Sequence, residues 1–368
     1  MIFSCNAQDL NQALSTVSHS IAIRSPKPVL EGVLLECCDE GIRLTCTDLT
    51  LGIETVIPAV IQEEGRAVMP GKLFCDIIRK LPGGDCVISV NNRLQSTISC
   101  ASFRMSIAGM DPIEYPELPE VKGESFKMSE RVLRSMIAGT LFATAVDESR
   151  PILTGCLMEI TTESMTMVAL DGFRLALRKE ELHGTEHNVQ AVIGGKVLSD
   201  ISRILTDSEE EVEICVGKSH VEFKIGATRM IARTLEGEFI RYRQILPAEW
   251  KTKTNVARRD LESAIDRASL IARESKSNLV SFSIEGEQLR ITSNSETSDT
   301  EEKIQVYTEG ADLTIAFNVR YVTDVLKVLS DDNIVMRFNS NVSPCVICPE
   351  QGDGYLYLVL PVRVFNAQ

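Results

Sequence analysis

Two hydrophobic periods alternate along the chain. Residues 212–216 and 221–225 place apolar side chains at every second position and are separated by a short turn, as in a β-hairpin. Residues 86–90 and 94–98 repeat this pattern, whereas residues 71–81 place apolar side chains at helical spacing. Strand-like segments outnumber helical ones, and hairpins imply antiparallel sheets. The pattern therefore predicts an α+β fold.

The helical segment recurs three times at a constant spacing. Residues 71–81, 195–205 and 319–329 each carry apolar residues on one face and basic residues on the other. Their aspartates are 124 residues apart, and so are their first basic residues; they are Asp76, Asp200 and Asp324, and Lys72, Lys196 and Arg320. Constant spacing indicates an internal repeat rather than a chance likeness between amphipathic helices.

Two more sets of landmarks follow a similar spacing. Leucines that begin amphipathic runs are 123 and 128 residues apart, and polar residues that follow strand-like segments are 123 apart. They are Leu10, Leu133 and Leu261, and Asp48, Asp171 and Asn294. Each repeat then contains two helices, expected over residues 7–24, 71–80, 129–143, 195–205, 258–273 and 319–330.

Proline-containing segments at residues 111–119 and 246–250 separate the repeats. Such segments are typical of linkers between domains. The sequence therefore predicts three similar domains of antiparallel sheets and paired helices, with boundaries at 1–123, 124–251 and 252–368.

Composition narrows the class of protein. The 368 residues are 44% hydrophobic and 24% charged, which is globular composition, and their formal net charge is −14. This acidic balance argues against a simple basic nucleic-acid-binding domain and favours an acidic cytosolic enzyme or adaptor. No signal peptide and no apolar run of about 18 residues is found. Eleven irregularly spaced cysteines suggest reduced thiols, so the expected location is the cytoplasm.

No catalytic, metal or cofactor site emerges from the motifs. Gly194-Gly195-Lys196 lacks the earlier glycine of a phosphate loop, because that position is Gln190. The pair Cys345 and Cys348 has no second pair, and Gly184 interrupts the helix that His183 and His187 would need to bind a metal together. We therefore expect no catalytic residue, metal or cofactor.

Charge is distributed unevenly between helices and the rest of the chain. Basic residues outnumber acidic ones in the six expected helices, whereas acidic residues dominate elsewhere. One interpretation is that these are ordinary amphipathic helices with basic outer faces. The other is that six equivalent helices share a positive surface that holds a polyanion, while acidic sheets face outward.

The most specific segments resemble the bacterial DNA sliding clamp family, the β subunit of DNA polymerase III. They are residues 142–155 (FATAVDESRPILTG), residues 169–176 (ALDGFRLA) and the ending 355–363 (YLYLVLPVR). Their order, the threefold repeat and the chain length extend the resemblance over essentially the whole chain. The resemblance implies a head-to-tail homodimer that closes into a ring, with helices lining the hole and sheets outside.

The resemblance also implies sites. The dimer interface would pair Met105 and Ile107 with Leu270 and Ile271 of a second copy. Cations would contact the phosphates of double-stranded DNA without reading its sequence. Those carried over from the family are Arg24, Lys72, Arg79, Arg150 and Lys196; the helical pattern adds Lys80, Arg134 and Arg203.

A peptide-binding pocket between the second and third domains is implied for polymerases and the clamp loader. Its matching positions are Leu153, Leu170, Gly172, Phe173, Arg174, Leu175, Ile240, Ile245, Asn318, Tyr321, Val342, Pro344, Leu358, Leu360, Pro361, Val362 and Arg363. Four positions depart from the best-known members: Phe173 replaces a histidine, Gln244 an arginine, and Leu360 and Val362 methionines. Residues 364–368 extend past the usual end of the family.

The function expected from this resemblance is that of a non-enzymatic processivity factor. It would tether the DNA polymerase III catalytic subunit, other polymerases and repair proteins to DNA, and a clamp loader ATPase would open it. Its location would be the bacterial cytoplasm, at the nucleoid during replication, with no membrane partner. The alternative is an acidic multidomain enzyme with an active-site cleft between domains, which the absence of catalytic motifs disfavours.

Overall fold

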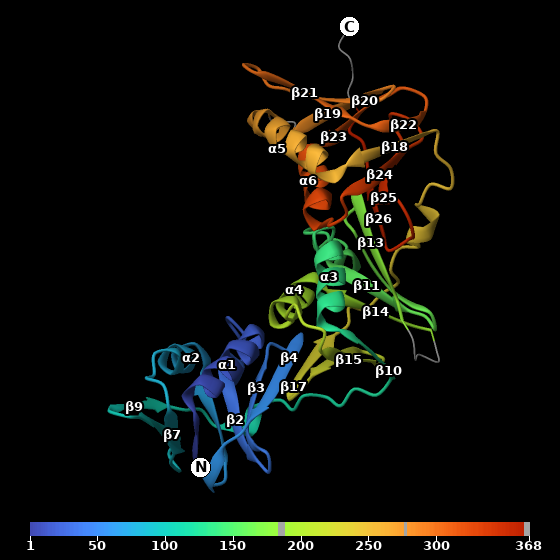
Figure 1. The fold of residues 1–368 in the computed structure, drawn as a ribbon. Helices are drawn as coiled ribbons and strands as arrows, with labels where there is room; N and C mark the ends of the chain where they lie inside the picture. The colour runs from blue at the N-terminus through green and yellow to red at the C-terminus, as the bar shows by residue number, and fades with distance from the viewer. Residues whose placement is uncertain (183–187, 276–277, 364–368) are drawn as a thin grey trace. The chain divides into compact units, whose positions relative to one another are not determined.

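The computed structural model describes residues 1–182, 188–275 and 278–363 (Figure 1). The chain forms two compact units, Met1–Arg131 with Gly184–Thr234 and Val132–His183 with Leu235–Gln368. Each of the six α-helices in the described residues begins directly after a strand. They are α1 (Ala7–Val17), α2 (Gly71–Arg79), α3 (Glu130–Leu141), α4 (Gly195–Ile204), α5 (Arg258–Glu274) and α6 (Val319–Val328).

The first helix is shorter than the sequence suggested. The expected range 7–24 was wrong, because α1 ends at Val17 and continues only as the 3₁₀ turn η1 (Ser18–Ser20). The Ser20 hydroxyl is buried and lies 3.0 Å from the Val17 carbonyl and 2.9 Å from the Cys46 carbonyl. Serine side chains that bond to nearby backbone compete with helix continuation. The other five ranges agree with the structure within two residues.

The first unit contains two antiparallel sheets. One has the order β5-β1-β7-β8-β9 and the other the order β10-β15-β16-β17-β4-β3-β2-β6. The first sheet is formed by β1 (Ile2–Asn6), β5 (Val60–Glu63), β7 (Asp85–Val90), β8 (Gln95–Cys100) and β9 (Phe103–Ala108). The second is formed by β2 (Gly32–Cys38), β3 (Gly41–Thr47), β4 (Leu51–Ile57), β6 (Arg66–Pro70), β10 (Glu124–Ser129), β15 (Glu211–Val216), β16 (His220–Ile225) and β17 (Thr228–Arg233). Strand β14 (Val189–Gly194) leads into α4.

The second unit also contains two sheets. Strands β11, β12, β13, β26, β25, β24, β18 and β22 follow one another in one sheet, and the other has the order β21-β20-β19-β23. The first set is β11 (Gly155–Ile160), β12 (Ser164–Leu170), β13 (Arg174–Glu181), β18 (Thr252–Ala257), β22 (Tyr307–Gly310), β24 (Asn333–Phe338), β25 (Cys345–Pro349) and β26 (Tyr355–Val359). The second is β19 (Leu279–Glu285), β20 (Gln288–Asn294), β21 (Asp299–Gln305) and β23 (Leu313–Asn318).

Alternation of buried and exposed residues explains how these elements pack. Helix α2 buries Phe74, Ile77 and Ile78 and leaves Lys72 and Arg79 exposed. Helices α1 and α2 pack against each other, as do α5 and α6, which lie side by side in Figure 1. The hairpins expected at residues 86–98 and 212–225 are confirmed as β7–β8 and β15–β16.

Two strand pairs join successive repeats. Strand β4 of the first repeat pairs with β17 of the second, with Gly52 opposite Ile231. Strand β13 of the second repeat pairs with β26 of the third, with Leu175 opposite Leu358. The same register therefore recurs at both joints, and at each joint one sheet runs from one repeat into the next.

Candidate functional site

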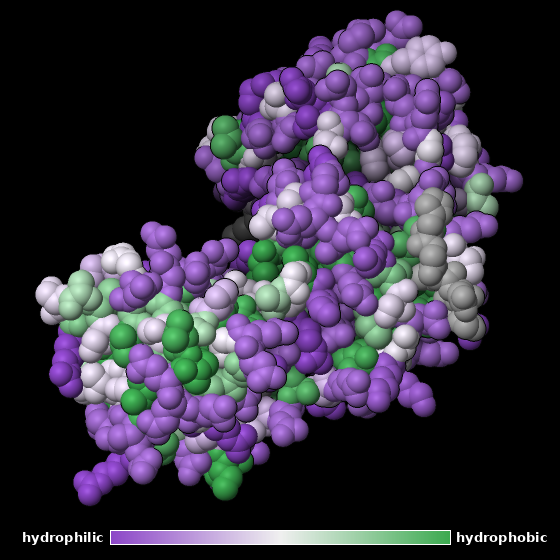
Figure 2. Space-filling model, turned by 60° about the horizontal axis from the view of Figure 1, so that its bottom comes forward, coloured by the Kyte–Doolittle hydropathy of each residue, from purple (hydrophilic) through white to green (hydrophobic). Residues whose placement is uncertain are grey.

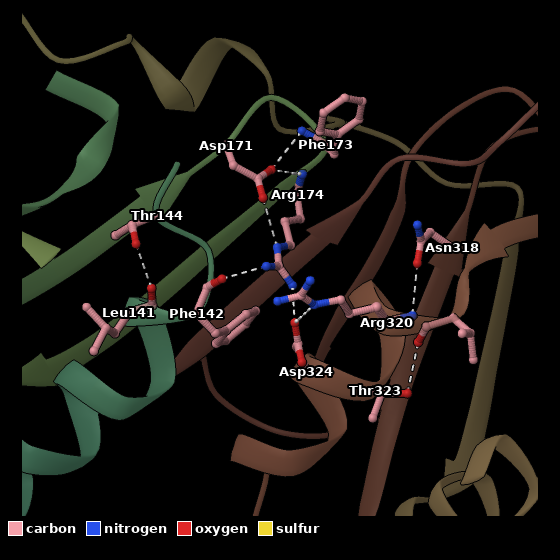
Figure 3. A network of polar contacts seen from close by, with 11 residues as sticks. Leu141, Phe142, Thr144, Asp171, Phe173, Arg174, Asn318, Arg320, Thr323 and Asp324 are labelled. Atoms are coloured by element: carbon pink, nitrogen blue, oxygen red, sulfur yellow. Dashed lines mark hydrogen bonds and ion pairs between the residues drawn. The ribbon is translucent and has the colours of Figure 1, made fainter. Parts of the chain in front are cut away.

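Arg174 is the centre of a polar network in the second unit (Figure 3). Its side chain belongs to the first residue of β13, and the residue is only 8% exposed. Its guanidinium donates to Asp171 Oδ2 at 3.0 Å, to Asp324 Oδ2 at 2.6 Å and to the Phe142 carbonyl at 2.6 Å. A buried charge is tolerated when it is paired and hydrogen-bonded. The network therefore joins three segments that are distant in sequence.

Aromatic rings lie against the same guanidinium. Its carbon is 5.2 Å from the centroid of the Phe142 ring and 4.8 Å from that of Tyr321. The Phe173 ring in turn stacks on Tyr321, with centroids 5.9 Å apart. Phe173 is 57% exposed, so this stack extends from the buried arginine to the surface.

The turn between β12 and β13 fixes Phe173. Asp171 Oδ1 accepts hydrogen bonds from the backbone N–H groups of Phe173 and Arg174 at 2.9 and 3.0 Å. Gly172 between them has φ +91°, a conformation that glycine adopts without steric cost. One carboxylate therefore orders the turn with one oxygen and binds the guanidinium with the other.

Helix α6 presents the opposite side of the network. Asn318 caps this helix, because its Oδ1 accepts the Arg320 N–H at 3.0 Å. The first turns of the helix carry Tyr321 and Asp324. Arg320 Nε also lies 3.8 Å from Asp324 Oδ2, so two arginines share that carboxylate.

The end of the described chain runs beside both elements. The Leu360 N–H donates to the Phe173 carbonyl at 2.9 Å, and the Val362 N–H to the Ala316 carbonyl at 2.8 Å. Together with the pairing of Leu358 and Leu175, these bonds bring residues 170–175, 318–324 and 358–362 together.

The expected pocket residues all lie in the second unit, but their exposure differs. Buried are Leu153, Leu170, Arg174, Leu175 and Leu358. Exposed are Gly172, Phe173, Ile245, Val342, Val362 and Arg363. Intermediate are Ile240, Asn318, Tyr321, Pro344, Leu360 and Pro361. Exposed apolar side chains together with buried leucines are expected of a small apolar binding site.

The sequence did not single out Phe142, Asp171 and Asp324 as partners of Arg174. A signal for two of them was present, because Asp171 and Asp324 both stand at repeat landmarks. Phe142 contributes its carbonyl and its ring face, which no residue-type pattern identifies.

The eight candidate DNA-contacting cations are all exposed. Arg24, Lys72, Arg79, Lys80, Lys196 and Arg203 belong to the first unit, and Arg134 and Arg150 to the second. Arg79 pairs with Asp76 at 3.2 Å and Arg203 with Asp200 at 2.8 Å, each one helical turn away. The Arg79–Asp76 pair is exposed on both sides and is therefore weak, whereas the exposed Arg203 pairs with a buried carboxylate.

Lys196 approaches Asp48, the landmark equivalent to Asp171, at 3.4 Å. Burial opposes ionisation of Asp48, but its pKa is lowered overall because the Thr50 hydroxyl, backbone N–H groups and Lys196 favour the carboxylate.

The candidate dimer residues belong to one strand and one helix. Met105 and Ile107 lie on β9, an edge strand of the five-stranded sheet, and Leu270 and Ile271 on α5. Met105 is 38% exposed and Leu270 64%, whereas Ile107 is buried in its own unit. Figure 2 shows one face of the molecule, where hydrophilic residues cover most of the surface and hydrophobic ones form small groups.

Within residues 1–182, 188–275 and 278–363, no three His, Cys, Asp or Glu side chains are grouped as a metal site. His183 and His187 lie outside the described residues, as does the extension 364–368, and Cys345 and Cys348 are buried free thiols. No described helix is long and apolar enough to cross a membrane.

Comparison with known proteins identifies the family that shares this architecture. Sequence models of the N-terminal, central and C-terminal domains of the DNA polymerase III beta subunit match residues 1–119, 127–240 and 243–363. The beta sliding clamp of Staphylococcus epidermidis is 34% identical over 367 residues, covering 97% of each chain.

Solved structures agree. The DNA polymerase sliding clamp from Bacillus subtilis superposes with a TM-score of 0.97 at 31% identity, over 99% of this chain and 100% of that one. A sliding clamp from Pseudomonas aeruginosa, crystallised bound to griselimycin, gives a TM-score of 0.92 at 25% identity, over the same shares of the two chains. Three domains of antiparallel sheets and helices are common to this fold. The chain therefore belongs to the DNA polymerase III beta subunit family, the beta sliding clamps, and is a non-catalytic processivity factor of DNA polymerase.

Proposed function

We propose that two copies of this chain close head to tail into a ring that encircles double-stranded DNA, with domain boundaries at 1–123, 124–251 and 252–368. The likeness to sliding clamps over 97% of the chain carries the proposal. An open edge strand, β9, and an exposed leucine on α5 support it, since a closed ring needs two different surfaces on each copy.

The exposed cations would contact the DNA inside this ring. They are Arg24, Lys72, Arg79, Lys80, Arg134, Arg150, Lys196 and Arg203. Phosphate contacts carry no sequence information, so the chain could remain bound while it slides. The acidic net charge of −14 then arises outside the helices, because basic residues outnumber acidic ones within them.

The surface around Phe173 would bind short peptides of partner proteins. Phe173, Ile245 and Val342 expose apolar side chains, and a rigid network of hydrogen bonds lies beneath Phe173. The griselimycin complex of the Pseudomonas aeruginosa clamp supports ligand binding by this fold. The partners proposed are the DNA polymerase III catalytic subunit, other polymerases and repair proteins.

A clamp loader ATPase would open the ring, because the sequence has no phosphate loop of its own. The ring would then act in the cytoplasm at the nucleoid during replication. The alternative of an acidic enzyme with an interdomain cleft receives no support from the comparisons, which all lead to sliding clamps.

Retention on circular DNA tests the encircling mode. The chain is loaded onto a nicked plasmid by a clamp loader with ATP, and free protein is removed by gel filtration. We expect the chain to stay with the circle and to leave once a restriction enzyme cuts it. Protein that stays on the linear product would show binding by contacts alone and would overturn the ring.

A further inference from the structure

The segment between β17 and β18 is bound to the sheet at Glu159. Glu159, in β11, accepts the Tyr242 hydroxyl at 2.5 Å and two N–H groups of Arg243 at 3.1 and 2.8 Å. Tyr242 and Arg243 are consecutive residues of the 3₁₀ turn η5 (Tyr242–Gln244). A single carboxylate therefore binds two neighbouring residues of this turn.

Two of the three side chains in these contacts are largely buried, unlike those of a loose ion pair at the surface. Tyr242 is 3% exposed, and the Glu159 side chain is largely buried. The Arg243 guanidinium carbon lies 4.8 Å from the centroid of the Tyr242 ring. Burial and the bond to Glu159 both raise the pKa of Tyr242, so the hydroxyl remains a donor.

The same turn fixes two candidate pocket residues. The Tyr242 N–H donates to the Ile240 carbonyl at 2.7 Å, and the Ile245 N–H to the Tyr242 carbonyl at 3.0 Å. Ile245 is 43% exposed, although the turn beside it is tightly bound. The backbone on either side of Tyr242 therefore takes its position from the Glu159 contacts.

We propose that Glu159 is a positioning residue of the peptide site, which holds Ile240 and Ile245 in the arrangement that receives a ligand. The proposal rests on the proposed function of that surface. Ordering the turn before binding removes an entropic cost from the binding step. If the turn were loose, only the ordered fraction of molecules would bind, and the apparent dissociation constant would rise in proportion.

Glu159→Gln in the full-length chain tests the proposal, with griselimycin as the probe. The substitution keeps the side-chain shape and removes the charge that Arg243 binds. We expect the dissociation constant to rise roughly tenfold, because charged hydrogen bonds are among the stronger polar contacts. The rise should come mainly from slower association, since a smaller fraction of molecules then holds the turn in the ordered state. Surface plasmon resonance separates the two rate constants.

Glu163→Gln is the matched control, since it removes the same charge from an exposed position near the end of the same β11–β12 hairpin. We expect no change in griselimycin binding for this variant. An equal loss in both variants would show a general charge effect and would overturn the positioning role.

Three further experiments distinguish positioning from simple structural support. Amide hydrogen exchange over residues 238–246 should accelerate in Glu159→Gln, while the strands of the same sheet keep their protection. Trp250 is the only tryptophan and lies in the same segment, so its fluorescence should change as well. Combining Glu159→Gln with Arg243→Gln should add little to either single effect.

The possible outcomes distinguish the role of Glu159 from the proposed function of the peptide site. If the wild-type chain does not bind griselimycin, the proposed peptide site fails and this inference fails with it. If the wild-type chain binds and Glu159→Gln binds equally well, only the role of Glu159 is refuted.

Discussion

At the scale of single residues, Arg174 shows why a site residue can be identified from sequence while its role is not. The resemblance marked this arginine as part of a pocket, yet the side chain is buried against Asp171, Asp324 and the Phe142 carbonyl. Two of these partners are 32 and 150 residues away, and no local pattern reports such distances. The arginine thus orders the surface beneath Phe173 rather than presenting its charge to solvent.

Arg174→Ala should destabilise the chain by about 3 kcal/mol, because the half-buried carboxylates of Asp171 and Asp324 lose their buried cationic partner. It should also weaken griselimycin binding, since Tyr321, on which Phe173 stacks, loses the guanidinium that lies against its ring. Urea unfolding and a binding titration measure the two effects. Arg150→Ala, at an exposed position, is the control, and we expect it to change stability by less than about 0.5 kcal/mol. Equal stability of the two variants would refute the structural role of Arg174.

Cys156 gives a pH dependence at the same scale. Burial raises the pKa of this thiol from 9.0 to about 12, against a weaker opposing effect of the Thr140 hydroxyl. The thiol's contribution to stability is therefore complete below pH 9 and is lost as the pH rises from 9 towards 12. The loss is about 1.4 kcal/mol per pH unit for one such group.

Cys156→Ser removes this ionisation, so its free energy of unfolding should fall less steeply between pH 9 and 11 than that of the wild type. Cys38→Ser, at a half-buried thiol, serves as the control. Parallel slopes for wild type and Cys156→Ser would contradict the assignment.

At the scale of secondary structure, the sequence predicted most helices and hairpins because their hydrophobic periods are regular. Helix α1 was the exception, since the serines that end it bond to backbone carbonyls instead of extending the apolar stripe. The turn at Tyr242 was not foreseen either. Its order comes from Glu159, 83 residues away, rather than from its own sequence.

Helix α5 and strand β9 carry the residues of the proposed dimer interface. Leu270→Asp removes an exposed leucine from α5, and each interface then loses about 2 kcal/mol of apolar burial. A closed dimer has two such interfaces, so the dissociation constant should rise roughly a thousandfold. Sedimentation equilibrium should show a dimer for the wild type and a monomer for the variant. Ile113→Asp, at an exposed isoleucine outside both elements, should remain dimeric. A monomeric Ile113→Asp would show a nonspecific effect.

At the scale of the whole molecule, the threefold repeat was legible in the sequence because landmarks such as Asp76, Asp200 and Asp324 recur at equal intervals. The division into two compact units was not. Each unit combines parts of neighbouring repeats, because β4 pairs with β17 and β13 with β26 across the repeat boundaries.

The proposed inner surface predicts a salt dependence. Replacing Lys72, Arg79 and Lys80 together by alanine should lower the slope of log affinity against log salt by up to about 0.9 per lost phosphate contact. Binding to a short duplex at several salt concentrations measures this slope. Lys122→Ala, an exposed lysine paired with Glu120, should leave it unchanged. An unchanged slope in the triple variant would place the DNA elsewhere.

The strand pairs between repeats have a consequence for cutting the chain. A fragment ending at residue 251 would lack β26 and leave the long edge of β13 without a partner. Open backbone edges of this kind recruit other strands and cause aggregation. Each repeat therefore relies on its neighbour to cover a strand edge, and we expect proteolysis between the repeats to yield insoluble pieces.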